Sequence, residues 1–364
     1  MNKIFVHAYL AGNLGDDLLV RILCMRYPNT QFRMIASPDY KERFSDMSNV
    51  KVYSPGDSEI DRKNNFFKKY FHKEDGFRKF LIKTSTAVVH IGGSVFTQHF
   101  EDWSAFYHVD AELLRLSKRL YVIGANFGPY TNPDYYNQYH DLFPKYSGIC
   151  FRDSYSAGLF PDLPNITWAP DVAFNYKINA SASQKQVAVS LISLKNRDGK
   201  YSISKYSDCY LKFMASLITL YMSDGYHIIF VSFCSQQGDL DAISDLLALV
   251  DFDIAGCTSI CSYDKNMEEC IQAFAESETV IGTRFHSVIL GWLFNKKVLP
   301  IIYNPKTLHL LEDNDCPYYL ELSDLEYANP TEVRHHLDSL PPFESSALKQ
   351  AAANQFAALD SILK

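Results

Sequence analysis

Short apolar runs rich in β-branched and aromatic residues alternate with longer helical patterns along most of this 364-residue chain. This alternation is typical of parallel β-sheets, because two parallel neighbours need a long crossover, usually a helix, between them. The chain is long for a single hydrophobic core, so two domains are expected. The strands predicted in the first half lie at 3–9, 32–37, 50–54, 87–92, 119–125, 148–153 and 166–171.

The alternation stops at residues 178–186, a polar segment without apolar periodicity that is typical of a linker. It then resumes, and we predict an α/β protein with two Rossmann-like domains facing each other over a central cleft. The N-terminal domain should span 1–178 and the C-terminal domain 187–330, with a helical tail, 331–364, packing back across their junction. In the second half, predicted strands lie at 187–193, 227–233, 278–282 and 298–304, and predicted helices at 207–225, 267–277 and 287–294.

Composition and charge exclude several classes of protein. The formal net charge of −7 argues against nucleic acid as a partner, so an anionic ligand would need a local cluster of cations. We expect a cytoplasmic protein, because no apolar run approaches the length of a membrane span and the N-terminal apolar stretch is too short for a secretory signal. The eight cysteines are scattered and show no metal-ligand spacing, so we expect no metal and no disulfide.

Ligands of open α/β sheets bind beyond the carboxyl ends of the strands, so the strand-to-helix loops are the places to search. The first is AGNLGDDLL, residues 11–19. There Gly12 and Asn13 would let the backbone approach a ligand, and Asp16 or Asp17 would act as general base or bind sugar hydroxyls. The alternative is that both carboxylates only cap the helix and favour its dipole.

Two further loops in the first half carry polar groups. Gly92, Gly93 and Ser94 follow a strand and could bring backbone amides and a hydroxyl against a ligand, although a Gly-Gly turn needs none. Arg152 follows the strand at 148–153 directly, and Asp153 with Ser154 should cap the next helix. Arg152 is a candidate clamp for a carboxylate or phosphate, or else a partner of Asp153 or a surface residue.

The strongest candidate site lies in the second half. Arg284 and His286 stand between the strand at 278–282 and a helix expected to begin at or just after Ser287. In an extended loop the two side chains would share a face and add positive charge to helix-start amides that already favour an anion. Lys306 leaves the next strand toward the same region. The competing interpretation makes His286 an ordinary core histidine.

Two more segments complete the candidates. Asp171 stands in a loop near the domain border. The stretch 61–83 carries eight Lys/Arg against three Asp/Glu, interleaved with six aromatic residues. A basic and aromatic helix of this kind can bind an anionic membrane surface, although such stretches are more often solvated helices with an aromatic face in the core.

These motifs, taken in order, resemble the polysaccharide pyruvyl transferase family. The resemblance covers about residues 8–305 and includes GNLGDD, the Gly92–Ser94 turn, RD-x-x-S, PDVAF and GTRFHS, of which the Arg284-x-His286 junction is the most informative. It implies a glycosyltransferase-B-like enzyme that transfers pyruvate from phosphoenolpyruvate to two hydroxyls of a sugar, forming a cyclic ketal. The N-terminal domain would bind the acceptor and the C-terminal domain the donor.

The resemblance also implies roles for single residues. Arg284 and His286 would bind the donor phosphate, with His286 as a proton donor, and Arg152 would meet phosphoenolpyruvate from the other side. Lys306 is assigned to the same donor site from its position in the sequence alone, without a matching family motif. Asp16, Asp17 or Asp171 would be the base toward the sugar. No cofactor or metal is implied, and the acceptor would be a surface polysaccharide or its lipid-linked precursor at the inner membrane face.

Two other functions fit the same sequence. A glycosyltransferase would use the helix-start cations to bind the diphosphate of a nucleotide-sugar, and nucleotide-sugars would then bind in place of phosphoenolpyruvate. A non-catalytic carbohydrate-binding or scaffold protein would keep the fold and would tolerate replacement of Arg284 without loss of ligand binding.

Overall fold

The computed structural model describes residues 1–71, 75–98, 100–177, 182–195, 197, 202–251, 255–264 and 266–364. The chain forms two compact units. Unit 1 comprises Met1–Ala11, Asp16–Asn175 and Ala351–Lys364, and unit 2 comprises Gly12–Gly15 and Tyr176–Gln350. The predicted linker, 178–186, lies partly outside the described residues. The predicted tail is divided, because its residues from Ala351 onward belong to unit 1.

Unit 1 is built on a seven-stranded sheet in the order β3-β2-β1-β4-β5-β6-β7, in which all neighbours are parallel. This is the doubly wound order, in which the chain reverses direction across the sheet between β1 and β4. Each strand lies at a predicted apolar run. The strands are β1 (Lys3–Ala8), β2 (Gln31–Ile35), β3 (Val50–Tyr53), β4 (Ala87–Ile91), β5 (Leu120–Ala125), β6 (Gly148–Phe151) and β7 (Ile166–Trp168).

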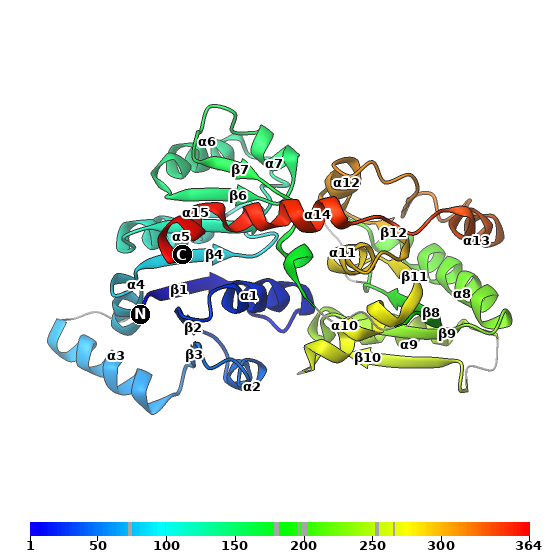
Figure 1. Ribbon diagram of the computed structural model, residues 1–364, viewed down its shortest axis with the longest axis horizontal. Coiled ribbons are helices and arrows are strands. Elements are labelled where there is room, and N and C mark those ends of the chain that lie inside the picture. The colour runs from blue at the N-terminus through cyan, green and yellow to red at the C-terminus, as the bar shows by residue number, and fades with distance from the viewer. Residues whose placement is uncertain are drawn as a thin grey trace. The chain divides into compact units, whose positions relative to one another are not determined.

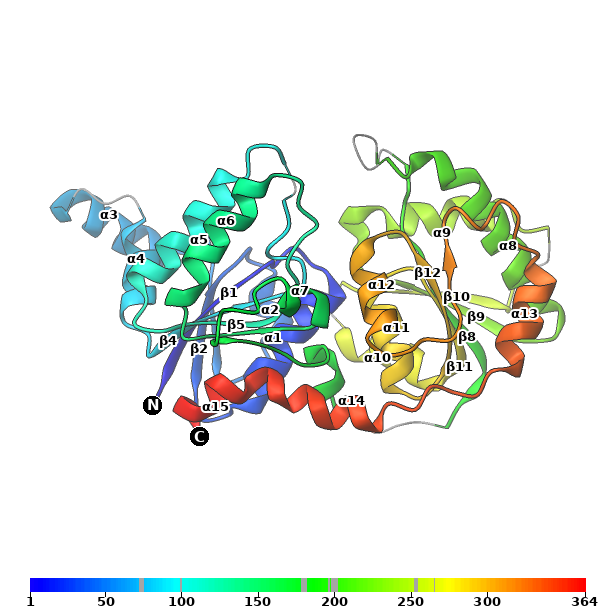
Figure 2. The same ribbon diagram turned by 90° about the horizontal axis from the view of Figure 1, so that it is seen from above.

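Helices cover both faces of this sheet. Figure 2 shows α4, α5 and α6 on one face and α1 with α15 on the other. The high aromatic content of the chain is explained here, because Phe96, Phe127, Tyr139 and Phe143 form the centre of one continuous ring cluster. The helices are α1 (Leu14–Arg26), α2 (Tyr40–Arg43), α3 (Ser58–Phe71), α4 (Gly76–Lys83), α5 (Ser104–Leu116), α6 (Pro133–Leu142), α7 (Ser154–Gly158) and α15 (Ala357–Leu363).

Unit 2 has a six-stranded parallel sheet in the order β10-β9-β8-β11-β12-β13, with its reversal between β8 and β11. The predicted α/β class and the two Rossmann-like domains are therefore confirmed (Figure 1). The edge strands β10 and β13 were not predicted, because each is short and only partly buried. The strands are β8 (Gln184–Ser190), β9 (His227–Ser232), β10 (Thr258–Ser262), β11 (Ser277–Gly282), β12 (Lys297–Ile302) and β13 (Leu320–Glu321).

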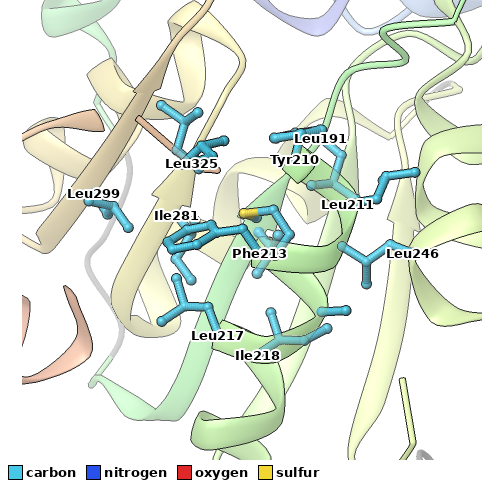
Figure 3. Close-up of a cluster of buried hydrophobic side chains, with 14 of the residues drawn as sticks. Leu191, Tyr210, Leu211, Phe213, Leu217, Ile218, Leu246, Ile281, Leu299 and Leu325 are labelled. Atoms are coloured by element: carbon cyan, nitrogen blue, oxygen red, sulfur yellow. The ribbon is translucent and has the colours of Figure 1, made fainter. Parts of the chain in front are cut away.

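The core of unit 2 lies between its sheet and the long helix α8, whose side chains Phe213, Leu217 and Ile218 pack against Ile281 and Leu299 (Figure 3). One predicted boundary is wrong. Helix α11 begins at Phe285 and has Arg284 as its N-cap, whereas the sequence suggested a start at Ser287. The helices are α8 (Ser207–Ser223), α9 (Asp239–Leu247), α10 (Met267–Glu276), α11 (Phe285–Leu293), α12 (Pro305–Glu312), α13 (Pro330–Ser339) and α14 (Ser346–Ala351).

The C-terminal segment is tied into unit 1 by a buried glutamine. The Gln355 amide oxygen accepts from the backbone N–H of Gly124 at 2.9 Å, beside an irregularity in the pairing of β5 with β6. Its amide nitrogen donates to the carbonyls of Phe151 at 2.9 Å and Ala169 at 2.6 Å. One side chain thus satisfies three buried backbone groups, each of which would be costly to leave without a partner.

Replacement of Gln355 by alanine should lower the free energy of unfolding by about 2 kcal/mol or more, because three buried backbone groups lose their hydrogen bonds. Thermal unfolding followed by calorimetry measures the change. Gln350→Ala is the matched control, since Gln350 is exposed on α14 and should have almost no effect. Equal midpoints for the two variants would contradict this account of the C-terminal segment.

Candidate functional site

The strongest site of unit 2 lies where its sheet reverses direction. Arg284 follows β11 by two residues, and its backbone N–H donates to Oγ of Ser190, the last residue of β8, at 3.3 Å. The Ser190 hydroxyl in turn donates to Oγ of Ser287 at 2.7 Å. This chain of bonds joins the carboxyl ends of the two central strands to the start of α11. The predicted arginine therefore stands at the topological switch point, where ligands of such sheets bind.

A buried carboxylate orients the Arg284 side chain. Nε donates to Oδ2 of Asp239 at 3.1 Å, a second nitrogen pairs closely with Oδ1, and Nη1 donates to the amide oxygen of Gln237 at 2.5 Å. Asp239 is itself fixed, because Oδ2 also accepts from the backbone N–H groups of Phe233 and Cys234. Burial alone would lower the pKa of Arg284, but Asp239 raises it above the ordinary value, so the guanidinium stays charged.

Asp239 and Gln237 are functional candidates that the sequence reasoning missed. The sequence did contain a signal for these two residues. The segment QQGDLD, residues 236–241, follows the predicted strand at 227–233 and leads into the next helix. Within the described part of the chain, the bonds above use three of the five N–H groups of Arg284. The remaining two can serve an anion, while the bidentate pair with Asp239 fixes the plane of the guanidinium.

Three cations gather around Tyr303, which follows β12. Burial would raise the pKa of Tyr303, but the positive charges of Lys306, Arg284 and Arg197 together lower it below its ordinary value. The Arg197 guanidinium carbon lies 5.6 Å from the centre of the Tyr303 ring, and Lys306 Nζ lies 5.7 Å from the centre of the Phe285 ring. The structure thus brings together the predicted Arg284 and Lys306 and adds Arg197 and Tyr303, which the sequence reasoning did not select.

His286 lies in the first turn of α11 and is buried, so the segment is helical and not the extended loop that was expected. Its ring packs edge-on against Phe285. The loop Gly12–Gly15 belongs to unit 2 by its contacts, and a Cβ built on Gly15 would lie 1.9 Å from Nδ1 of His286. Only glycine fits against this imidazole. The predicted Gly12 and Asn13 stand in the same four-residue loop, and Asn13 Oδ1 accepts from the Gly15 N–H at 3.0 Å.

Unit 1 holds a second buried cation, Arg152, which is neither a surface residue nor a partner of Asp153. Nη1 donates to Oδ2 of Asp171 at 3.2 Å, and Nη2 donates to Oδ1 of Asn126 at 2.7 Å. Asn126 is a further residue that sequence reasoning missed, although it follows β5 directly. Asp153 caps α7 by accepting from the Ser156 N–H at 2.7 Å, as predicted.

The paired glycines after β4 belong to the same cluster in unit 1. A Cβ built on Gly93 would lie 2.5 Å from Nη1 of Arg152, so Gly93 makes room for the guanidinium. Ser94 Oγ lies 3.5 Å from Oδ1 of Asn126. Gly92 takes a φ of 150°, in the region that favours glycine. The structure therefore brings Gly93, Ser94, Arg152 and Asp171 into one polar cluster at the carboxyl end of the sheet.

The two acidic residues of the first loop differ in their surroundings. Asp17 is buried and accepts from the Tyr40 hydroxyl at 2.7 Å, with Nη1 of Arg43 3.9 Å from its other oxygen. Asp17 thus holds α2 against α1. Asp16 is half-buried in the first turn of α1. Among the described residues, no group of three His, Cys, Asp or Glu side chains is placed to hold a metal ion.

Comparison with solved structures defines the class of fold. HepE from Anabaena, solved with UDP and glucose, has a TM-score of 0.56 at 11% identity, covering 98% of this chain and 100% of that one. A glycosyltransferase from Rickettsia africae scores 0.53 at 11% identity, covering 100% and 95%. The UDP-GlcNAc 2-epimerase from Methanocaldococcus jannaschii scores 0.55 at 11%, covering 99% and 100%. The chain thus has the two-domain fold shared by glycosyltransferases of the B type and such epimerases.

Comparison of the sequence with protein families identifies the family of this chain. The family model described as polysaccharide pyruvyl transferase matches residues 13–305, and the protein belongs to that family. No match was found among curated proteins. The chain is accordingly a transferase of polysaccharide biosynthesis, and the matched range contains the Arg284 and Arg152 clusters.

Replacement of Asp239 by asparagine should destabilise unit 2 by about 3–5 kcal/mol, because it leaves the buried Arg284 guanidinium without its counter-charge. Denaturant unfolding measures the effect. The matched control is Asp241→Asn, since Asp241 is exposed two residues further along α9. If both variants unfold like the wild-type protein, Asp239 does not hold Arg284 in the way described.

Proposed function

We propose that the protein transfers pyruvate from phosphoenolpyruvate to two hydroxyls of a sugar, forming a cyclic ketal in a surface polysaccharide or its lipid-linked precursor. Membership of the polysaccharide pyruvyl transferase family supports this reaction. The observation that carries the proposal is the gathering of Arg284, Lys306 and Arg197 around Tyr303 at the carboxyl ends of β8, β11 and β12.

Phosphoenolpyruvate matches that cation cluster in charge and size. It carries a phosphate and a carboxylate a few bond lengths apart, so it needs several donors within one small site. Arg284 would bind the phosphate, because Asp239 fixes its orientation and the bonds to Asp239 and Gln237, among the described residues, use only three of its five N–H groups. Lys306 supplies a mobile point charge. Arg152, with Asn126 and Asp171, is the proposed substrate contact of unit 1.

The reaction needs one proton delivered and two removed. The enol methylene takes up a proton and becomes a methyl group, and each sugar hydroxyl gives up one as its oxygen bonds to C2. One of the two hydroxyl protons balances the methyl group and the other leaves with phosphate. We assign His286 as the donor on the phosphate side and Asp16 as a base toward the sugar.

The remaining first-loop and glycine-turn residues are assigned to substrate positioning. Gly12 and Asn13 shape the loop beside His286, and Gly92, Gly93 and Ser94 shape the turn beside Arg152. Asp17 and Asp171 are better suited to orienting neighbours than to accepting protons, because each contacts an internal cation or hydroxyl. No cofactor or metal enters the proposed reaction.

A nucleotide-sugar glycosyltransferase is the second candidate. The observation favouring it is that the fold matches HepE from Anabaena, which was solved with UDP and glucose. The same cations of unit 2 could neutralise a diphosphate. The two candidates differ in the donor, so a binding measurement separates them.

Phosphoenolpyruvate should raise the unfolding midpoint of the protein, and UDP- and CMP-sugars should not, because only a ligand that binds the folded state stabilises it. Arg284→Lys should remove most of this shift and most transfer activity, since a single ammonium cannot reproduce the guanidinium fork. Lys297→Arg, at the first residue of β12 and so at the opposite end of that strand from Tyr303, is the control. A midpoint raised only by nucleotide-sugars would favour the glycosyltransferase.

A peripheral contact with an anionic membrane is part of the proposal and would place the enzyme in the cytoplasm at the inner membrane face. Helix α3 projects from the body of unit 1 in both views (Figures 1 and 2). Phe66, Tyr70 and Phe80 are 51%, 60% and 42% exposed, and Lys68 and Lys69 are adjacent. Exposed aromatics among basic residues fit a lipid headgroup layer. None of the described helices has the length and apolar character to span a membrane.

Reversing both charges, Lys68→Glu with Lys69→Glu, should weaken binding to vesicles that contain anionic phosphatidylglycerol, because each basic residue near such a surface contributes about 1 kcal/mol. Co-sedimentation with these vesicles measures the change, and neutral phosphatidylcholine vesicles give the baseline. Charge reversal at Lys195 and Lys212 in unit 2 is the matched control. Unchanged sedimentation of the α3 variant would show that α3 is ordinary surface.

A further inference from the structure

A histidine pair stands at the topological switch point of unit 1, and nothing in the proposed site uses it. His7 is the penultimate residue of β1 and His90 the penultimate residue of β4. The two are register partners across these parallel strands, which are the pair between which the strand order reverses. Their rings therefore lie on the same face of the sheet, with centres 4.6 Å apart. In unit 2, Arg284 stands two residues beyond β11, one of the two strands between which that sheet reverses.

A buried carboxylate stands behind the pair. Oδ1 of Asp110, from α5, lies 3.1 Å from Nδ1 of His90, and its Oδ2 accepts from the Tyr139 hydroxyl at 2.8 Å. Both His90 and Asp110 are buried, with 5% and 3% exposure, whereas His7 is only partly buried. The carboxylate thus lies at ion-pair distance from the inner imidazole, and the inner imidazole contacts an outer one that is only partly buried. A carboxylate behind an imidazole sets its orientation and tautomer.

We propose that His7 is a proton acceptor for an acceptor-sugar hydroxyl and that His90 and Asp110 are its positioning residues. The inference rests on the proposed function and extends it. Ketal formation deprotonates two different hydroxyls, so a single base such as Asp16 leaves one deprotonation without an assigned group. His90, the ring partner of His7, packs against α5 through Asp110, whereas Asp16 belongs to α1, and these two helices cover opposite faces of the sheet (Figure 2).

The proposed step conserves atoms and electrons. As the hydroxyl oxygen forms its bond to C2 of the enolpyruvyl group, the O–H bond breaks and the proton moves to the imidazole nitrogen of His7. The electron pair of the O–H bond stays on oxygen and becomes part of the new C–O bond. The proton later leaves for solvent or for the departing phosphate, and no oxidant or reductant takes part.

The charge state of His7 fits a base. Burial first, then the electrostatic influence of His90 and of Arg78 on α4, holds the pKa of His7 well below its ordinary value of 6.5. His7 is therefore neutral and able to accept a proton at pH 7. Among the described residues, Asp110 and Glu112 of α5 are charged groups of the same region. Glu112 pairs with Arg78, and the Tyr139 hydroxyl of α6 donates to Asp110.

The sign of the pH dependence follows from this pKa. Activity requires the neutral imidazole, so it falls when the pH drops through the pKa of His7 in the folded protein. Removal of a positive charge near the ring makes protonation easier and raises that pKa. Arg78→Gln should therefore move the acidic limb of the activity profile to higher pH, whereas Arg78→Lys keeps the charge and should leave the limb in place.

The test uses the full-length enzyme with phosphoenolpyruvate and a panel of p-nitrophenyl hexopyranosides, and it measures phosphate release and the pH profile. His7→Gln should lower kcat about 10²–10³-fold with little change in the KM for phosphoenolpyruvate, in the range expected for loss of general base help. Added imidazole should restore part of the activity of His7→Ala. His108→Gln, an exposed histidine of α5, is the matched control.

The outcomes separate this inference from the proposed function. If the wild-type protein releases phosphate and the His7→Gln variant keeps its full kcat, the role of His7 is overturned while the proposed function stands. Loss of activity in His7→Ala without imidazole rescue, together with an unmoved acidic limb in Arg78→Gln, would show a structural role for His7 and also overturn it. A wild-type protein that consumes no phosphoenolpyruvate with any glycoside would contradict the proposed function, and the inference with it.

Discussion

The buried ion pair between Arg284 and Asp239 is the interaction on which the site of unit 2 depends. Taking two charges out of water is costly, and an apolar pair of similar volume would often be at least as stable. Here the pair fixes the plane of a guanidinium at the carboxyl ends of the central strands. Asp239 is itself held by two backbone N–H groups, so its orientation is set by the loop after β9. Burying the two charges costs stability, and the structural result is a cation whose orientation is fixed.

The same principle governs unit 1 with different chemistry. Its doubly wound sheet also reverses direction between two central strands, and polar side chains gather at that edge. Arg152 is held by Asp171 and Asn126, and Gly93 leaves the space that its guanidinium fills. At the switch point itself the residues are imidazoles, His7 and His90, and not a permanent cation. Unit 2 thus presents a fixed cation at the carboxyl end of its sheet, and unit 1 presents two imidazoles there beside its own buried arginine.

Much of this organisation could be predicted from the sequence, and the failures have physical reasons. Short apolar runs located every strand of the unit 1 sheet, because strands buried on both faces are almost wholly apolar and do not alternate. The strand-to-helix loops then gave Arg152, Arg284 and Lys306, since helix starts that carry cations are informative by themselves. Asp239, Asn126 and Arg197 were missed because their importance comes from partners far away in the sequence, which only the fold brings close. The N-cap position of Arg284 was missed because apolar periodicity cannot locate the first turn of a helix that is buried on all sides.

Phosphoenolpyruvate is the proposed donor, and the family and the cation cluster of unit 2 support it. The most direct measurement follows its carbon skeleton. The enzyme would be given phosphoenolpyruvate labelled with ¹³C at C2 together with an acceptor glycoside, and carbon NMR would follow the label. We expect the labelled carbon to become a ketal carbon bonded to two sugar oxygens, with release of phosphate. A label that stays in phosphoenolpyruvate while a sugar is transferred from a nucleotide-sugar would contradict it.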